Sequence, residues 1–83
     1  MFSNKTKDGR NNLCGKQVAK YRLALGKSQR QLAEMLQLLG LDVDKNAIQR
    51  IEAGLRFVTD IETVYLAKAL KVTYEQLLGE TES

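Results

Sequence analysis

The sequence predicts an all-α fold, with five short helices in one small domain. Three observations support this prediction: the chain contains no proline, its apolar residues recur at helical spacings, and three capping pairs mark helix starts. At 83 residues, of which 43% are hydrophobic and 28% are charged, the chain can bury one small core and is too apolar for a disordered protein.

The first predicted helix covers about residues 13–25. Asn12 is suited to be its N-cap, and Gly26 is suited to end it in the left-handed conformation. Residues 1–11, which precede it, are polar and rich in Lys and Asn, so we expect a flexible basic arm. The apolar residues of this first helix, spaced by four, three and four positions, should form its buried face: Cys14, Val18, Tyr21 and Leu25.

The second and third predicted helices cover residues 29–39 and about 45–53. Ser28 and Gln31 form a capping box at the start of the second helix, and Gly40 ends it. Its buried stripe should consist of Leu32, Met35, Leu36 and Leu39. The intervening residues lack a helical period and predict a turn, in which Asp44 caps the third helix; Gly54 then closes that helix.

The fourth and fifth predicted helices cover about residues 60–71 and 74–78. Two further capping boxes begin them, formed by Thr59 with Glu62 and by Thr73 with Gln76. The core positions that we expect on the fourth helix are Val64, Leu66, Ala67 and Leu70, and the short fifth helix contains the apolar residues Tyr74, Leu77 and Leu78. The folded domain should therefore span residues 12–79, with a frayed tail over 80–83.

Composition excludes several classes of function. One cysteine and no histidine leave no internal disulfide, no zinc cluster and no catalytic pair that needs histidine, so we expect neither an enzyme nor a cofactor. Cys14 is expected to be a small core residue. There is no apolar run of about 18 residues and no signal-peptide pattern, which predicts a cytoplasmic protein with no membrane partner.

Charge is distributed unevenly along the chain. Residues 1–27 carry seven basic residues against one acidic residue, a net charge of +6, whereas residues 57–83 have a net charge of −3. The N-terminal part is therefore suited to approach a polyanion, although ordinary surface charge is an alternative explanation.

The third predicted helix has one polar and one apolar side. At about 100° per residue, an arc of roughly 140° contains Lys45, Gln49, Ala53, Asn46 and Arg50. The opposite arc contains Ala47, Ile48 and Ile51. Lys and Arg suit guanine edges, and Asn and Gln suit adenine edges, so this face could read DNA bases. A solvated polar face is the alternative explanation.

Two segments, Ser28–Glu34 and Ile48–Gly54, carry a family resemblance. Together with the order of the helices, they make residues 13–79 similar to the Cro/cI-like, or XRE, family of helix-turn-helix repressors. This resemblance implies a compact five-helix lambda-repressor-like DNA-binding domain, in which the second helix supports the third and the third enters the major groove.

The resemblance also implies roles for individual residues. Base-reading positions are Lys45, Asn46, Gln49 and Arg50, of which Lys45 and Asn46 lie closest to the groove floor and Arg50 could instead reach a phosphate. Phosphate-contacting positions are Gln29, its neighbours Lys27 and Arg30, and Arg56 in the loop after the third helix. Gln29 could also be an ordinary polar residue of a first helical turn.

Support for the third helix is implied at four further positions: Arg22, Glu52, Ile48 and Ile51. In many relatives the residues matching Arg22 and Glu52 form an ion pair between the first and third helices, and the two isoleucines anchor the apolar side. Two unrelated surface charges are the alternative for Arg22 and Glu52.

One departure from the family pattern concerns the connection between the second and third helices. It is roughly five residues longer than the compact family version, whose turn has three or four residues. We expect the second helix to run about one turn further, and Leu41 and Val43 to pack back over the core.

These features predict a sequence-specific double-stranded DNA-binding protein, a transcriptional regulator that acts as a repressor by occupying its operator. A homodimer on a palindromic site is expected, with the last two helices, including Leu77 and Leu78, as the dimer surface. The alternative function is an antitoxin or adaptor with a protein partner, motivated by the apolar cluster Leu38, Leu39, Leu41 and Val43.

Overall fold

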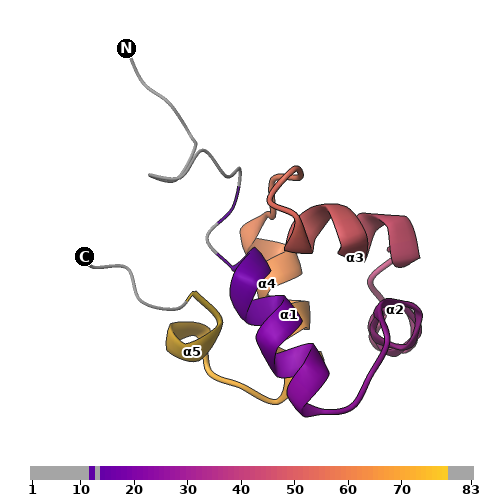
Figure 1. Cartoon of the computed structure of the whole chain (residues 1–83). Helices are drawn as coiled ribbons and strands as arrows, with labels where there is room; N and C mark the ends of the chain where they lie inside the picture. Colours follow the sequence, from indigo (N-terminus) through magenta and orange to yellow (C-terminus); the bar gives the residue numbers. More distant parts are fainter. Residues whose placement is uncertain (1–11, 13, 79–83) are drawn as a thin grey trace.

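A computed structural model describes residue 12 and residues 14–78, and all regular secondary structure within these residues is α-helical. The five helices are α1 (Gly15–Ala24), α2 (Gln29–Leu39), α3 (Lys45–Glu52), α4 (Asp60–Leu70) and α5 (Tyr74–Leu78) (Figure 1). The predicted all-α, five-helix fold is thus confirmed. The expected basic arm over 1–11 and the tail over 80–83 lie outside the described residues.

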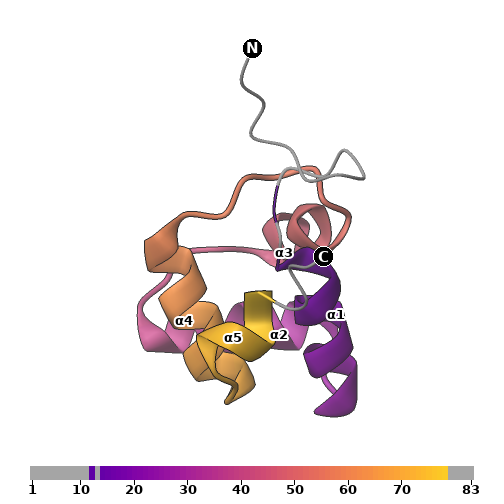
Figure 2. The same cartoon turned by 90° about the vertical axis from the view of Figure 1, so that its left-hand side faces the viewer.

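The helices are arranged so that α3 lies along one edge of the molecule. In both views α3 and the loop that follows it occupy this edge, while α5 lies on the side away from them (Figure 1, Figure 2). Helix α1 lies between these two and contacts α3, α4 and α5, whereas α2 packs against α3 and α4. None of the described helices has the length and apolar character needed to cross a membrane.

All three predicted capping boxes form. In the first, Ser28 Oγ accepts from the Gln31 backbone N–H at 3.0 Å, and Gln31 Oε1 accepts from the Ser28 N–H at 2.8 Å. The same reciprocal bonds join Thr59 to Glu62 and Thr73 to Gln76. Asp44 caps α3 as predicted, since its Oδ1 accepts from the Ala47 N–H at 2.8 Å. Each cap satisfies helix-end donors and contributes about 1 kcal/mol.

One hydrophobic core is shared by all five helices. Its largest fully buried side chains are Leu32, Leu36, Ile48, Ile51, Leu66, Leu77, Val18 and Cys14. Full burial of a side chain such as leucine stabilises the fold by about 1.5–3 kcal/mol before conformational entropy is counted. Cys14 is therefore the core residue that we expected, with 2% of its surface exposed.

Two expected core positions at helix ends are wrong, and two apolar residues of α5 are also exposed. Leu25 and Leu39 are 42% and 44% exposed, because each lies at a helix end where the chain turns away at a glycine, Gly26 (φ +71°) or Gly40 (φ +108°). Tyr74 is 53% exposed, on the outward side of a helix of only five residues. Leu78, at the end of that helix, is 37% exposed, whereas Leu77 is fully buried.

Val64 is also outside the core, although it is partly buried. It lies about 160° around α4 from Leu66, outside the part of the helix that its neighbours cover. The order of apolar residues in α4 suggested a wider buried face than the neighbouring helices cover.

The start of the first helix differs from the prediction. Regular helix begins at Gly15, and its N-cap is Cys14, which makes no side-chain capping bond. Asn12 Oδ1 nevertheless accepts from the Gly15 N–H at 2.8 Å, the bond expected of an N-cap residue to the third residue after it.

The long connection between α2 and α3 folds back on the core. Val43 is 6% exposed and Leu41 packs against the core, as expected from the sequence. The Gln37 side chain donates to the Val43 carbonyl at 2.7 Å and ties the connection to the last turn of α2. Leu38 remains 88% exposed, so the apolar cluster of this region is split between core and surface.

Helix α4 ends without a glycine. Its C-cap, Lys71, adopts the left-handed conformation with φ 60° and ψ 45°, and it is the one described non-glycine residue with positive φ. A side chain with a Cβ makes this conformation costly by about 1–2 kcal/mol, so the end of α4 carries local strain.

We predict that Lys71→Gly raises the free energy of unfolding by about 0.5–1 kcal/mol, because relief of strain outweighs the added entropy of the unfolded chain. Lys68→Gly is the matched control: it lies inside the same helix and should lower stability by about 1 kcal/mol. Urea denaturation of both variants measures the difference; a loss of stability in both would contradict the strain argument.

Candidate nucleic-acid interface

Helix α3 is held by its apolar side and presents its polar side outward. Ile48 and Ile51 are 0% and 2% exposed, in the positions that the sequence predicted for anchors. The four predicted base-reading residues are all exposed on the other side: Lys45, Asn46, Gln49 and Arg50. The helix therefore exposes amide and cationic side chains together, which are groups suited to base edges and phosphates.

Three helices meet at the Glu52 carboxylate. The Arg22 guanidinium, from α1, donates through Nε to Oε2 at 2.7 Å and through Nη2 to Oε1 at 3.0 Å. Gln29, the first residue of α2, donates through Nε2 to the same Oε1 at 3.0 Å. The side chains of Arg22 and Glu52 are only 11% and 9% exposed. This three-residue cluster, Arg22–Gln29–Glu52, fixes the end of α3 relative to both supporting helices.

The Arg22 guanidinium also binds the α1–α2 loop. Its Nη1 donates to the Lys27 carbonyl at 2.8 Å, which joins the α1–α2 loop to the cluster. The hydrogen bond to Glu52 raises the pKa of Arg22 despite the opposing effect of burial. The Arg22 guanidinium is therefore charged at neutral pH, and its positive charge lies directly against the Glu52 carboxylate.

The start of α2 contributes the other predicted phosphate-contacting groups. Lys27 and Arg30 are exposed, and Gln29 is partly buried between them because its amide is bonded to Glu52. The backbone N–H groups of a first helical turn and the positive end of the helix dipole also lie here. Cations and amides thus surround a helix start beside α3.

Arg56 has a partner that the sequence did not indicate. Its Nη1 and Nη2 donate to the two oxygens of Glu62 at 3.0 and 2.9 Å, and the two side chains are 31% and 14% exposed. Glu62 is at the same time the capping glutamate of α4, so the guanidinium reinforces that helix start. The loop after α3 is thereby bound to α4.

Comparison with known proteins identifies the family. The family model described as "Helix-turn-helix" matches residues 18–77. The chain belongs to the helix-turn-helix family. Among solved structures, the restriction-modification controller protein C.AhdI from Aeromonas hydrophila is similar, with 28% sequence identity and a TM-score of 0.67; the match covers 76% of this chain and 84% of that one. No curated protein matches the chain.

These findings confirm the XRE-type resemblance and make the chain a DNA-binding transcriptional regulator. Within the helix-turn-helix fold, α2 and α3 occupy the places of the supporting and recognition helices.

Asn12 makes contacts that the sequence analysis did not predict. Asn12 is 7% exposed, and its side-chain amide donates to the carbonyls of Ile51 and Arg56. Its sequence context indicated only a helix cap. Backbone carbonyls distant in sequence leave no motif from which such partners could have been found.

The Arg56–Glu62 ion pair makes the stability of the fold depend on pH. Burial alone would raise the pKa of Glu62, but hydrogen bonds from Arg56 and from the Thr59 backbone lower it below its ordinary value. A carboxyl group with a lower pKa in the folded state stabilises the fold above its unfolded pKa of about 4.3, and this contribution is lost as the pH falls through the folded value.

We therefore predict that Glu62→Gln lowers the melting temperature at pH 7, and that the difference from the parent chain shrinks steadily as the pH falls below the unfolded pKa of about 4.3. Glu75→Gln is the control, since this exposed residue of α5 should show little difference at either pH. Thermal unfolding followed by circular dichroism at several pH values tests this. A difference that is constant with pH would assign the effect to packing.

Proposed function

We propose that this protein binds specific sequences of double-stranded DNA and that α3 reads the major groove. The observation that carries the proposal is the exposed polar face of α3, formed by Lys45, Asn46, Gln49 and Arg50, on a helix whose opposite side is buried. Lys45 and Asn46 belong to the first turn, the part of a recognition helix that lies closest to the bases.

Phosphate contacts would come from the two loops that flank this face. Lys27, Gln29 and Arg30 stand at the start of α2, where charge and helix dipole both favour an anion. Arg56 joins them because a guanidinium carries more N–H groups than the two that Glu62 accepts. A phosphate could be bound by the others without breaking the ion pair.

Regulation would follow from occupancy of the operator. A protein whose recognition helix fills the major groove at a promoter excludes other proteins from the same groove, so we propose a repressor. A single module of this size buries only about 600–1,000 Å² on DNA, which favours two copies on a palindromic site.

We predict that Lys45→Ala and Asn46→Ala each cost about 1–3 kcal/mol of binding free energy on the preferred sequence and relax the preference at defined base pairs. Binding would be measured by fluorescence titration against duplexes selected from a random pool. Arg56→Ala should instead weaken all sequences to a similar extent and reduce the salt dependence.

Lys68→Ala is the matched control for Lys45→Ala. It removes the same charge from α4, where the ammonium lies 5.9 Å from the centre of the Tyr65 ring, outside the α3 face. It should leave the base preference unchanged. Uniform loss across all sequences for Lys45→Ala and Asn46→Ala would contradict base reading by α3.

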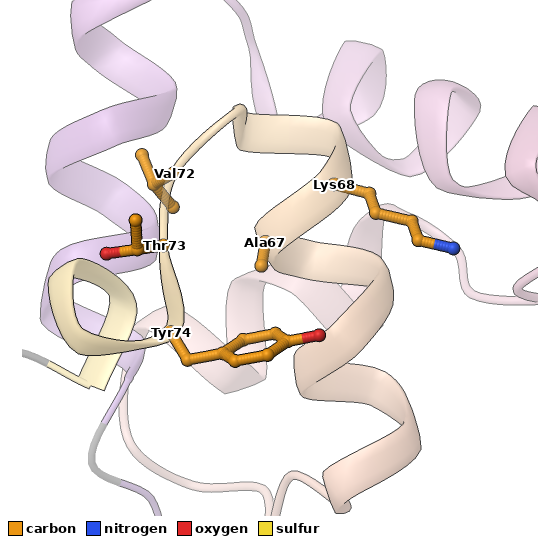
Figure 3. Close-up of a pocket in the computed structure, with 5 residues that line it drawn as sticks. All are labelled: Ala67, Lys68, Val72, Thr73 and Tyr74. Carbon is orange, nitrogen blue, oxygen red and sulfur yellow. The ribbon is translucent and has the colours of Figure 1, made fainter.

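We place the dimer surface on α4 and α5, as the sequence suggested, with Tyr74 in the place of Leu77. Leu77 is fully buried in the core and is not available, whereas Tyr74 and Leu78 are 53% and 37% exposed. Beside them is a cleft of about 380 Å³, lined by Ala67, Lys68, Val72, Thr73 and Tyr74. Figure 3 shows the Tyr74 ring beneath Ala67 and the Lys68 ammonium turned away from the cleft.

For this surface we predict that Tyr74→Glu shifts the dimer–monomer equilibrium at least about tenfold toward monomer, because a charge would replace the apolar ring at the interface. Sedimentation or light scattering over a range of concentrations measures the shift. Leu38→Glu is the control, since it places the same charge on an exposed apolar position of α2. A greater effect of Leu38→Glu would place the interface on α2.

A protein partner is a second candidate, favoured by the exposure of Leu38 and Leu39 at the end of α2. This patch is smaller than the sequence suggested, because Leu41 and Val43 pack inward. An antitoxin or adaptor role would require a stoichiometric partner that co-purifies with the chain and is lost in Leu38→Glu.

A further inference from the structure

Asn12 occupies a point where three parts of the domain meet. Its Oδ1 accepts from the Gly15 N–H at 2.8 Å, its Nδ2 donates to the Ile51 carbonyl at 3.0 Å, and the same nitrogen donates to the Arg56 carbonyl at 2.7 Å. Gly15 begins α1, Ile51 belongs to the last turn of α3, and Arg56 lies in the loop after it. Both amide hydrogens and the amide oxygen are therefore used.

The Asn12 side chain is buried, so its hydrogen bonds to the protein replace those that water would otherwise make. Asn12 is 7% exposed and is the one polar residue among the described residues to be classed with the buried core. A buried amide must have its donors and acceptor satisfied, and the carbonyls that it meets must have donors in turn. The site therefore discriminates against residues that lack two N–H groups.

The carbonyls that Asn12 binds belong to the segment that ends the DNA-facing helix. The Gly54 N–H donates to the same Ile51 carbonyl at 3.0 Å, and the Leu55 N–H donates to the Arg50 carbonyl at 2.9 Å. Asn12 thus adds an outside donor to the turn that closes α3. The second bond of the Asn12 amide goes to the Arg56 carbonyl. It therefore holds the loop at the residue whose side chain pairs with Glu62.

We propose that Asn12 is a positioning residue for DNA binding: its amide fixes the last turn of α3 and the following loop relative to α1. This inference rests on the proposed function of α3. Together with the Arg22–Gln29–Glu52 cluster, the bonds of Asn12 hold the C-terminal end of α3 at two neighbouring residues, Ile51 and Glu52. Asn12 touches no DNA in this scheme, and it acts through the placement of the α3 face and of the loop.

Two variants separate the donors of the amide from its acceptor. Asn12→Ala removes all three bonds. Asn12→Asp keeps an oxygen for the Gly15 N–H but turns a carboxylate toward the carbonyls of Ile51 and Arg56, so it spares the α1 contact and removes the other two. Burial beside two carbonyl oxygens should raise the pKa of the introduced carboxyl, and its protonated form can donate one hydrogen bond.

The experiment measures the dissociation constant of the full chain for a duplex selected by the parent, at a temperature where circular dichroism shows each variant folded. We expect both variants to bind about tenfold more weakly at pH 8. On lowering the pH to about 5, Asn12→Asp should recover much of the loss, whereas Asn12→Ala should not. The parent should change little, because the chain has no histidine to titrate in this range.

Leu66→Val is the control for stability alone. Leu66 is buried in α4, so this substitution should lower the melting temperature without changing the DNA affinity of the folded chain. Parent-like affinity in both Asn12 variants would overturn the proposal. So would a loss in Asn12→Asp that does not respond to pH, since it would assign the loss to the fold and not to the donors.

Failure of the proposed function gives a different result, because the parent itself would then select no duplex. In that case hydrogen exchange still tests whether Asn12 holds the last turn of α3 and the following loop. The Gly54 and Leu55 amides should exchange at least about tenfold faster in Asn12→Asp than in the parent, with no matching change at Leu36 in the core. Equal exchange at Gly54 and Leu55 would overturn the positioning role independently of DNA.

Discussion

In the proposed function the orientation of α3 determines what the domain presents to DNA, and the Glu52 carboxylate fixes that orientation. A helix of eight residues is too short to be stable alone, so its placement comes from its contacts. Burial of Ile48 and Ile51 holds the helix to the core, but apolar contact is not directional and tolerates rotation. The bonds from Arg22 and Gln29 to Glu52 are directional, and they come from two different helices.

The same ion pair decides the charge of the face. Glu52 lies in the last turn of the helix that also carries Lys45 and Arg50, and an uncompensated carboxylate there would repel phosphates. Arg22 cancels that charge at 2.7 Å in a place where both side chains are about nine-tenths buried. Because ion pairs of this kind are costly to desolvate, the pair is better explained by the geometry and charge it gives to α3 than by a gain in stability.

Local signals account for the parts of the fold that the sequence predicted best. Both bounds of α2 and the start of α5 coincide with the predicted ranges, since capping boxes and glycine stops depend on residues three or four positions apart. Burial was less predictable: Leu39 and Val64 lie on plausible apolar faces, yet neither belongs to the buried core. Which part of a helix face is covered depends on where neighbouring helices stop, and periodicity carries no such information.

The candidate site divides in the same way. Arg22 and Glu52, separated by 30 positions, could be paired in advance only because the family pattern supplied both residues. Asn12 reaches carbonyls that are 39 and 44 positions away, and a carbonyl has no residue type to recognise. Arg56 was predicted from the resemblance of its loop to that of the family, but its geometry comes from the cap of α4. The loop that follows α3 is therefore shaped by groups outside it, Asn12 and Glu62, and its own residues would suffice to predict its chemistry but not its position.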